Sequence, residues 1–534
     1  MEELLAINVG IWSIVPPLLA IALALVTKEV IFSLVLGIVS GIMIYGFHAD
    51  FAFGQFFSST IEVVINNVSG NASMIIFLSL LGALVALITR AGGARAYGNW
   101  AVKKLATKRS ASLTTAFLGI IIFIDDYFNC LTVGTVMKPV TDRHRISREK
   151  LAYLIDSTAA PICVIAPISS WSASAAGYFP AEAGISGMQA FVQAIPFNLY
   201  ALLTIFMIFW IAGRKKADFG PMARAEARAE RGSALKDADI AVNDDIAKLS
   251  VSDKGRVLDL VAPVLILVAV CIGAMLFYGG LWDGSGKSAV EAFGDTDANL
   301  SLSLGGLITL IVAFFFYVPR KLISFKDFFA SITAGVKAMV PAIIILTLAW
   351  TIASVCKGML STGDYIAGLV GDSNMPVAII PAIMFAAACG IAFSTGTAWG
   401  TFGILIPITI TVCYQVAPHL SIPTLAAVMG GAVFGDHCSP ISDTTILAST
   451  GAGCNHIDHV ATQMPYALTV AGACFVGYLV TGFVTQAMVG GDTTGSGAAL
   501  LTTGPAALVG LPVTLAILVA LLLVFPKIFK AKRV

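Results

Sequence analysis

The sequence predicts an all-α polytopic membrane protein, with inverted repeats that each contain three spans, a re-entrant hairpin and two further spans. Three observations lead to this prediction. First, 57% of the 534 residues are hydrophobic and only 12% are charged, where a soluble globular chain has about 25% charged residues. Second, Lys and Arg are concentrated in alternate loops, and the intervening loop 279–300 has only Lys287. Third, two apolar stretches must enter and leave the membrane on the same side. Together these features predict about eleven transmembrane helices plus two hairpins.

Composition also limits the partners. The formal net charge is +1, which gives no reason to expect a nucleic-acid partner. The nine cysteines lie mostly in apolar segments, and we interpret them as reduced core residues. The first ten residues, MEELLAINVG, are acidic, whereas a secretory signal begins with basic residues, so we expect the first span to be retained.

A span needs about 20 apolar residues. Segments of this kind are predicted at 11–27, 30–46, 74–89, 151–178, 193–212, 256–280, 301–318, 338–360, 424–450, 463–489 and 505–526.

The loops between these spans divide sharply by charge. Loops 90–112, 138–150 and 213–256 and the C-terminal tail contain six, five, ten and four Lys or Arg residues. Loops 47–73, 179–192, 361–375 and 489–504 contain none. By the positive-inside rule, the first set is cytoplasmic. The N-terminus is therefore expected outside and the C-terminus in the cytoplasm.

Two apolar stretches do not fit simple crossing. Stretch 113–137 lies between two cytoplasmic loops, and stretch 376–418 lies between two external ones. Each is predicted to be a re-entrant hairpin, which is tolerated where protein or a water-filled cavity satisfies its backbone.

The two hairpins share sequence features. Pro139 in "VMKPV" and Pro407 in "ILIPI" are 268 positions apart, and the "PIS" prolines Pro167 and Pro440 are 273 apart. The order of elements also repeats, which is typical of secondary transporters. The predicted division is a first repeat at 1–212 with hairpin 113–137, a cytoplasmic linker at 213–256, a second repeat at 257–489 with hairpin 376–418, and a final span with a basic tail at 490–534.

Polar residues gather where the predicted spans break. They form four groups at the two hairpin tips and in the two spans that follow, and we expect them to bind an ion or substrate: Asp125, Asp126, Asn129; Asp156, Ser157; Ser394, Thr395, Thr397; Asp436, His437, Ser439, Ser442, Asp443, Thr444. An ionised Asp at the centre of a membrane helix costs about 2.5–3.5 kcal/mol, so these residues must face a cavity or a partner. Pro440 frees backbone carbonyls, which together with carboxylates are hard oxygen ligands suited to Na⁺.

Structural alternatives remain for several of these residues. Asp125, Asp126 or Asp156 could cap a helix, and His437 could be a hydrogen-bonded core residue rather than a proton relay. The cluster at residues 454–459, CNHIDH, is expected to lie in a surface loop, with a pH-sensing or metal site as the alternative. The chain contains no HExxH or GxSxG motif, so we expect no enzyme activity, no cofactor and no resident metal.

Three segments resemble the NhaC family of Na⁺/H⁺ antiporters, in the wider ion-transporter superfamily: "GDHCSPISDTTILASTGAGCNHIDHVATQMPYAL", "FIDDYFN" and "PISSWSASA". The resemblance implies an elevator-type transporter of the bacterial inner membrane that exchanges Na⁺, or Li⁺, for H⁺ by alternating access. The alternative is a Na⁺- or H⁺-coupled transporter of a small carboxylate or amino acid, like a malate/lactate exchanger. The expected partners are small inorganic cations or a small organic acid, the lipid bilayer and a second copy in a homodimer.

Overall fold

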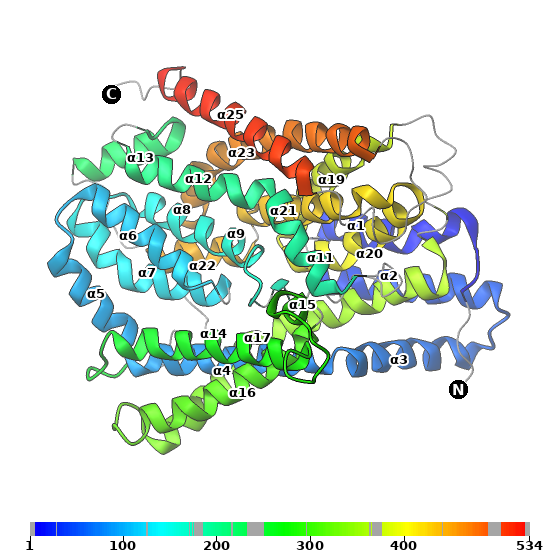
Figure 1. The fold of residues 1–534 in the computed structure, drawn as a ribbon, viewed down its shortest axis with the longest axis horizontal. Coiled ribbons are helices and arrows are strands. Elements are labelled where there is room, and N and C mark those ends of the chain that lie inside the picture. Colours follow the sequence, from blue (N-terminus) through cyan, green and yellow to red (C-terminus); the bar gives the residue numbers. More distant parts are fainter. Residues whose placement is uncertain are drawn as a thin grey trace.

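In the residues that it describes, the computed structural model consists of helices joined by turns and contains no strand, which confirms the all-α membrane class (Figure 1). These residues are 6–27, 29–123, 126–169, 171–172, 175, 185–214, 217–231, 250–294, 296–362, 365, 376–440, 442–489 and 504–528. Within them, seven helices are long and apolar enough to cross a membrane, or eight if one bent pair counts as a span. The number is below eleven because several predicted spans are interrupted or short helices.

The first half of the chain contains these helices: η1 Gly10–Ile14, α1 Val15–Thr27, α2 Val30–His48, α3 Phe53–Gly70, α4 Ala72–Ala91, α5 Gly93–Lys104, α6 Lys108–Ile121, α7 Asp126–Arg143, α8 Arg148–Thr158, α9 Ala160–Cys163, α11 Gly187–Ala194, η3 Ile195–Phe197 and α12 Leu199–Gly213. In the linker, α13 spans Gly220–Glu230.

The second half contains these: α14 Leu258–Tyr278, α15 Ala289–Gly294, α16 Ala298–Tyr317, α17 Phe325–Ser354, η4 Val355–Met359, η5 Val377–Ile379, α19 Ile380–Thr395, α20 Ala398–Val416, η6 Pro418–Leu420, α21 Ser421–Cys438, α22 Asp443–Ala452, α23 His456–Val489 and α25 Gly504–Ile528.

Helix α3 was not expected, because its residues fall in the stretch 47–73 that lacks Lys and Arg and was interpreted as an external loop. Phe53, Phe57, Ile61 and Ile65 recur every four residues and form one exposed apolar face. The opposite side of α3 packs against α2 and α17. Because the apolar face is narrow, polar residues occupy the rest of the segment and lower its mean hydropathy. A search for continuous apolar runs therefore misses this helix.

Two antiparallel helix pairs approach the centre of the molecule from opposite ends: α6 with α7, and α19 with α20 (Figure 1). Both members of the first pair pack against α8, and both members of the second pack against α21. The turn between α19 and α20 is formed by Gly396, whose φ is +70° and suits glycine. These pairs coincide with the segments interpreted as hairpins, while the inverted repeat itself stays a prediction.

Glycines allow the closest helix contacts. The backbones of Gly82 on α4 and Gly335 on α17 lie so near one another that a Cβ on either would overlap the other's backbone. On α21, Gly431 and Gly435 face the backbone of α19 in the same way. Such contacts are typical of membrane helices, where close approach supplies packing energy.

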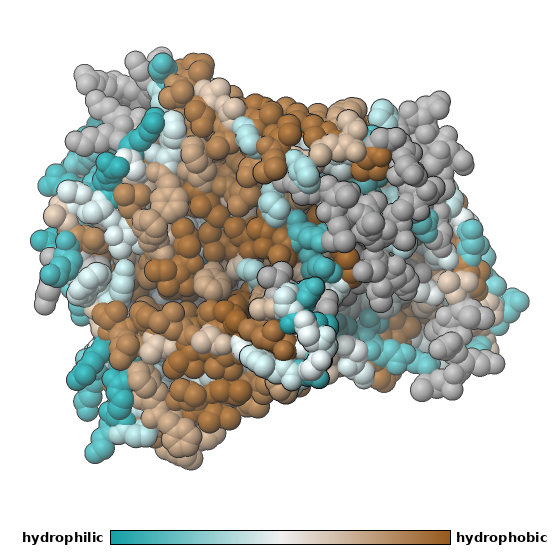
Figure 2. All heavy atoms as spheres, viewed as in Figure 1, coloured by the Kyte–Doolittle hydropathy of each residue, from teal (hydrophilic) through white to brown (hydrophobic). Residues whose placement is uncertain are grey.

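The surface has an apolar band across its middle and a polar region at one end. Brown, apolar residues cover the middle of the molecule, and teal, polar residues gather at the end where α5, α6 and α13 lie (Figure 2). Residues of three of the basic segments, which include Lys108, Arg145 and Arg231, lie at this end. We call it the basic end.

Candidate functional site

Two interrupted helices form the framework of the site. Helix α8 ends at Thr158 and is followed after Ala159 by the one-turn α9, with Pro161 in its first turn. Helix α21 ends at Cys438, and α22 starts at Asp443. The C-terminal end of a helix leaves backbone carbonyls unpaired and has a partial negative charge. Both ends therefore favour a cation nearby.

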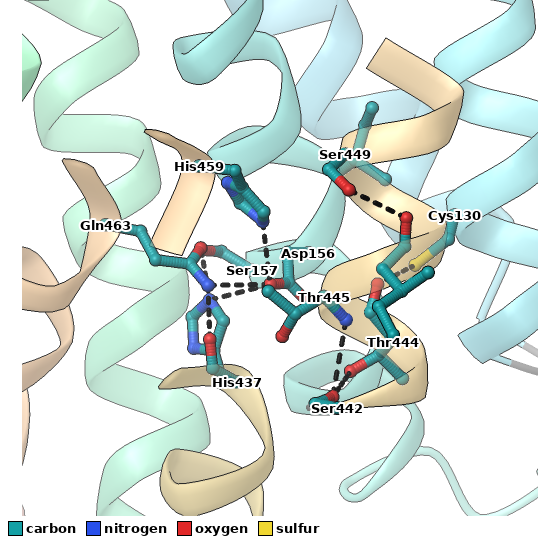
Figure 3. A network of polar contacts seen from close by, with 12 residues as sticks. Cys130, Asp156, Ser157, His437, Ser442, Thr444, Thr445, Ser449, His459 and Gln463 are labelled. Atoms are coloured by element: carbon teal, nitrogen blue, oxygen red, sulfur yellow. Dashed lines mark hydrogen bonds and ion pairs between the residues drawn. The ribbon is translucent and has the colours of Figure 1, made fainter. Parts of the chain in front are cut away.

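Asp156, in the last turn of α8, is the centre of the polar contacts (Figure 3). It is fully buried, and its Oδ2 accepts a hydrogen bond from Gln463 Nε2 at 2.8 Å and lies 3.2 Å from His459 Nε2. The Nε2 of His437 is 4.0 Å from the same oxygen. Among the described residues, Asp156 Oδ1 has no hydrogen-bond partner. The carboxylate therefore has one oxygen held in place and one available.

His437 connects the two interrupted helices. Its Nε2 is 3.0 Å from Ser157 Oγ on α8, and its Nδ1 is 3.0 Å from Tyr200 Oη on α12. The Gln463 amide also donates to the backbone oxygen of His437. A neutral imidazole has one donor and one acceptor nitrogen, so the hydroxyl groups of Ser157 and Tyr200 set its tautomer.

Asp436 occupies the break in α21 together with hydroxyl groups. Its Oδ1 accepts from Ser442 Oγ at 2.6 Å, and its backbone oxygen accepts from Thr445 Oγ1 at 3.3 Å. Ser442 Oγ also lies 3.0 Å from Thr444 Oγ1 and caps α22 by accepting from the Thr445 backbone N–H. The break is thus stabilised by side chains rather than by helical hydrogen bonds.

Asn129 joins the first helix pair to this site. Its Nδ2 contacts the backbone oxygens of Gly119, Ile122 and Thr158, at 2.6, 2.9 and 2.9 Å. Asn129 is buried, and within the described part of the chain its Oδ1 has no partner. Because the amide nitrogen faces three carbonyls, the oxygen points away from them and can accept or coordinate. Asp126 is also buried, one helical turn earlier on α7.

The structure brings several predicted site residues together and leaves others undescribed. The contacts above connect Asn129, Asp156, Ser157, Asp436, His437, Ser442 and Thr444 through the two breaks. Ser439 and Thr397 are buried, at the break in α21 and at the tip of α19–α20. Asp125 and the side chains of Ser394, Thr395 and Asp443 lie outside the described residues.

The prediction for residues 454–459 is wrong for His459. Helix α23 begins at His456 rather than near 463, so His459 lies in its first turn and is fully buried against Asp156. Gln463, one turn later, was also missed. His459 and Gln463 are four residues apart and share one helical face, a signal that was available from the sequence. Within the described residues, no group of three or more His, Cys, Asp or Glu side chains could hold a metal ion.

The chain matches the Na⁺/H⁺ antiporter family over residues 162–483, a range that includes the break in α21 and the first turn of α23. The chain belongs to this family. A protein of Haemophilus influenzae described only as uncharacterized is 41% identical over 505 residues, which cover 92% of this chain and 94% of the relative.

Two further comparisons accompany this family membership. The malate-2H⁺/Na⁺-lactate antiporter of Bacillus subtilis is 30% identical over 169 residues, which cover 30% of this chain and 34% of the relative. The crystal structure of the YdaH transporter of Alcanivorax borkumensis is similar with a TM-score of 0.46 at 14% identity, over 80% of this chain and 88% of that one. Of the polar residues in this site, the fully buried Asp156 is the one that best fits this family membership.

Proposed function

We propose that this member of the Na⁺/H⁺ antiporter family is a secondary active antiporter that exchanges Na⁺, with Li⁺ as a second cation, for H⁺ across the bacterial inner membrane. The observation that carries the proposal is Asp156: a fully buried carboxylate placed where two helix C-termini meet, with one oxygen that has no hydrogen-bond partner in the described part of the chain. Carboxylate, hydroxyl and carbonyl oxygens are the ligands that Na⁺ prefers.

The exchange follows from one site with two exclusive occupants. A proton on Asp156 removes the negative charge that a cation needs, and a bound cation leaves no place for the proton. Asp436 and the hydroxyl of Ser442 supply further oxygens within the same pair of broken helices. If only the protonated or the cation-loaded form crosses the membrane, exchange is obligatory without further machinery.

Alternating access is proposed to occur by elevator-type movement of inverted repeats. The linker supports a division into two bodies. Lys150 on α8 forms ion pairs with Asp218, just before α13, at 2.8 Å and with Glu226 on α13 at 3.7 Å, and α13 packs against α23. The later part of the linker is tied instead to α4, because the Ser252 N–H donates to the backbone oxygen of Arg90. Helix α14, which follows the linker, is joined to the segment after α16 by the ion pair between Asp259 and Arg320. The first body contains the site, and the second would be the scaffold.

The similarity to the malate-2H⁺/Na⁺-lactate antiporter favours a second candidate, in which the same cation coupling drives a small organic acid. The two candidates share the cation site, so they differ only in whether an organic anion also binds.

The test is proton movement in proteoliposomes that contain a pH-sensitive dye, with Na⁺, Li⁺ or K⁺ added outside. With the parent protein, external Na⁺ or Li⁺, but not K⁺, should drive protons out of the vesicles, so that the dye reports a rise in internal pH. Asp156→Asn should abolish this response because it keeps the shape of the side chain and removes the titrating charge. Asp253→Asn, an exposed residue of the linker, is the matched control and should exchange like the parent. Normal exchange by Asp156→Asn would place the coupling site elsewhere.

A further inference from the structure

Two tryptophans from distant parts of the chain contact each other near the tip of the α19–α20 pair. Trp171 follows α9 in the second part of the first interrupted span, and Trp399 is the second residue of α20. Their ring centroids are 5.1 Å apart with a 49° tilt, and Trp171 also meets Phe402 edge-on at 5.3 Å. Both tryptophans are buried.

Neither indole N–H has a hydrogen-bond acceptor among the described residues. An indole nitrogen is a donor only, and a buried donor without an acceptor is destabilising. Phenylalanine would supply an aromatic ring at these positions without this cost. Two such donors within one aromatic contact therefore suggest that a ligand provides the acceptor.

The first turn of α20 offers further hydrogen-bond donors, which like the indole N–H groups have a partial positive charge. Helix α20 begins at Ala398, directly after its N-cap residue Thr397. The backbone N–H groups of a first helical turn lack intrahelical partners and favour an anion. Because side chains on a helix lean toward its N-terminus, Trp399 lies over this turn.

The surrounding sequence indicates how an anion's charge would be balanced. Residues 380–416 contain no charged side chain, and residues 151–200 contain no Lys or Arg. No guanidinium or ammonium group from these segments is therefore available to neutralise a carboxylate. The neutralising charge would come from the cation held near Asp156, so the anion and the cation would bind together.

We propose that Trp171, Trp399 and the first turn of α20 form a subsite for the carboxylate group of a small organic acid. The two indole N–H groups and the backbone N–H groups donate to the carboxylate oxygens, and the rings, with Phe402, contact the apolar part of the acid. The proposal rests on the proposed function, since it assigns an organic anion to the same cation-coupled site.

The experiment uses the purified full-length protein and three probes: sodium acetate, sodium L-lactate and sodium L-malate, each compared with sodium chloride. Thermal unfolding in detergent measures binding, and proton movement in proteoliposomes measures coupling. At least one acid should raise the Tm of the parent in Na⁺ medium, with a smaller effect when choline replaces Na⁺. Trp171→Phe and Trp399→Phe should each weaken the apparent affinity for that acid by about tenfold, as expected for one lost hydrogen bond to a charged group.

Trp282→Phe is the control, because Trp282 is 64% exposed on the loop after α14 and should retain the parent's affinity and exchange. The proposal is overturned if no acid changes Tm or proton movement in a preparation that exchanges Na⁺ for H⁺. It is also overturned if both Phe variants bind the acid like the parent. Acid binding by a parent that shows no Na⁺/H⁺ exchange would support the subsite while refuting the proposed function, so the two failures are distinguishable.

Discussion

The Oδ2 atom of Asp156 lies 3.2 Å from the Nε2 atom of His459, although 303 residues separate them in the chain. The contact joins the last turn of α8 in the first half to the first turn of α23 in the second half. A buried carboxylate is tolerated in an apolar environment only when a partner compensates its charge or hydrogen-bonding capacity. His459 and Gln463 together provide that compensation for one oxygen, while the other remains available.

The first prediction concerns His459. His459→Gln removes the imidazole whose Nε2 contacts Asp156 Oδ2, and we expect the rate of Na⁺-dependent proton movement to fall by about tenfold or more, since a hydrogen bond to a charged group contributes about 1.5–3 kcal/mol. Asp458→Asn, on the exposed side of the same helical turn, should retain the parent's rate. Equal rates for His459→Gln and the parent would show that Gln463 alone suffices to hold the carboxylate.

The second prediction concerns Glu226 on α13. This buried side chain pairs with Lys108 at 2.7 Å and Lys150 at 3.7 Å, and it accepts from the Ser147 backbone N–H. Burial alone would raise the pKa of Glu226, but the two ammonium groups and the Ser147 N–H outweigh it and lower the pKa below its usual 4.5. The ionised carboxylate therefore stabilises the docking of α13 above about pH 4.5, and this contribution is lost as the pH falls through the lowered value.

Glu226→Gln should thus weaken the docking of α13 at neutral pH, in the same way that protonation of Glu226 weakens it in the parent at low pH. Removing one partner of a buried pair costs about 3–5 kcal/mol, and less here because Lys108 is one-third exposed. The measurement is trypsin cleavage after Arg224 and Arg228, which should become faster in the variant. Glu230→Gln, at an exposed pair with the same lysine, should leave cleavage unchanged. Cleavage of both variants at the parent's rate would mean that apolar contacts hold α13.

The third prediction concerns the α4–α17 contact. A methyl group at Gly335 would overlap the backbone of Gly82, so Gly335→Ala should force the helices apart and lower stability by about 1–3 kcal/mol. Gly472→Ala on α23 adds the same group where nothing lies within 4 Å, and it should be neutral. Thermal unfolding in detergent compares the two, and equal Tm values would show that the contact can relax.

The sequence predicted the fold class and the two helix breaks because each leaves a local sign. Apolar runs mark the spans, and Pro161 and Pro440 with nearby Asp residues mark the interruptions. Two features were not predicted from the sequence. The narrow apolar stripe of α3 has no continuous hydrophobic run, and His459 follows a polar stretch that is typical of a loop. Its four-residue spacing from Gln463 does indicate a shared helical face, but the burial of that face against Asp156 is a tertiary contact that the surrounding residues do not reveal.

The last prediction tests orientation and the inverted repeat. If the pairs α6–α7 and α19–α20 are hairpins that enter from opposite sides, their outer ends must face opposite compartments. Ala106, in the link before α6, and Gln415, near the end of α20, are both exposed at such ends. Ala106→Cys should react with a membrane-impermeant maleimide from the cytoplasmic side, and Gln415→Cys from the external side. The native cysteines are buried, except the half-buried Cys389, so the parent provides a low background.

Ser250→Cys and Ser285→Cys calibrate this assay, because they flank the single long helix α14 and should label from opposite sides. Reaction of Ala106→Cys and Gln415→Cys from the same side, with the α14 pair behaving as expected, would contradict the inverted arrangement. The two helix pairs would then reach the site from one face, and movement of an elevator-type body could not expose it to both compartments in turn. Coupled exchange would in that case require a different conformational change, with the broken helices α8 and α21 as the parts that move.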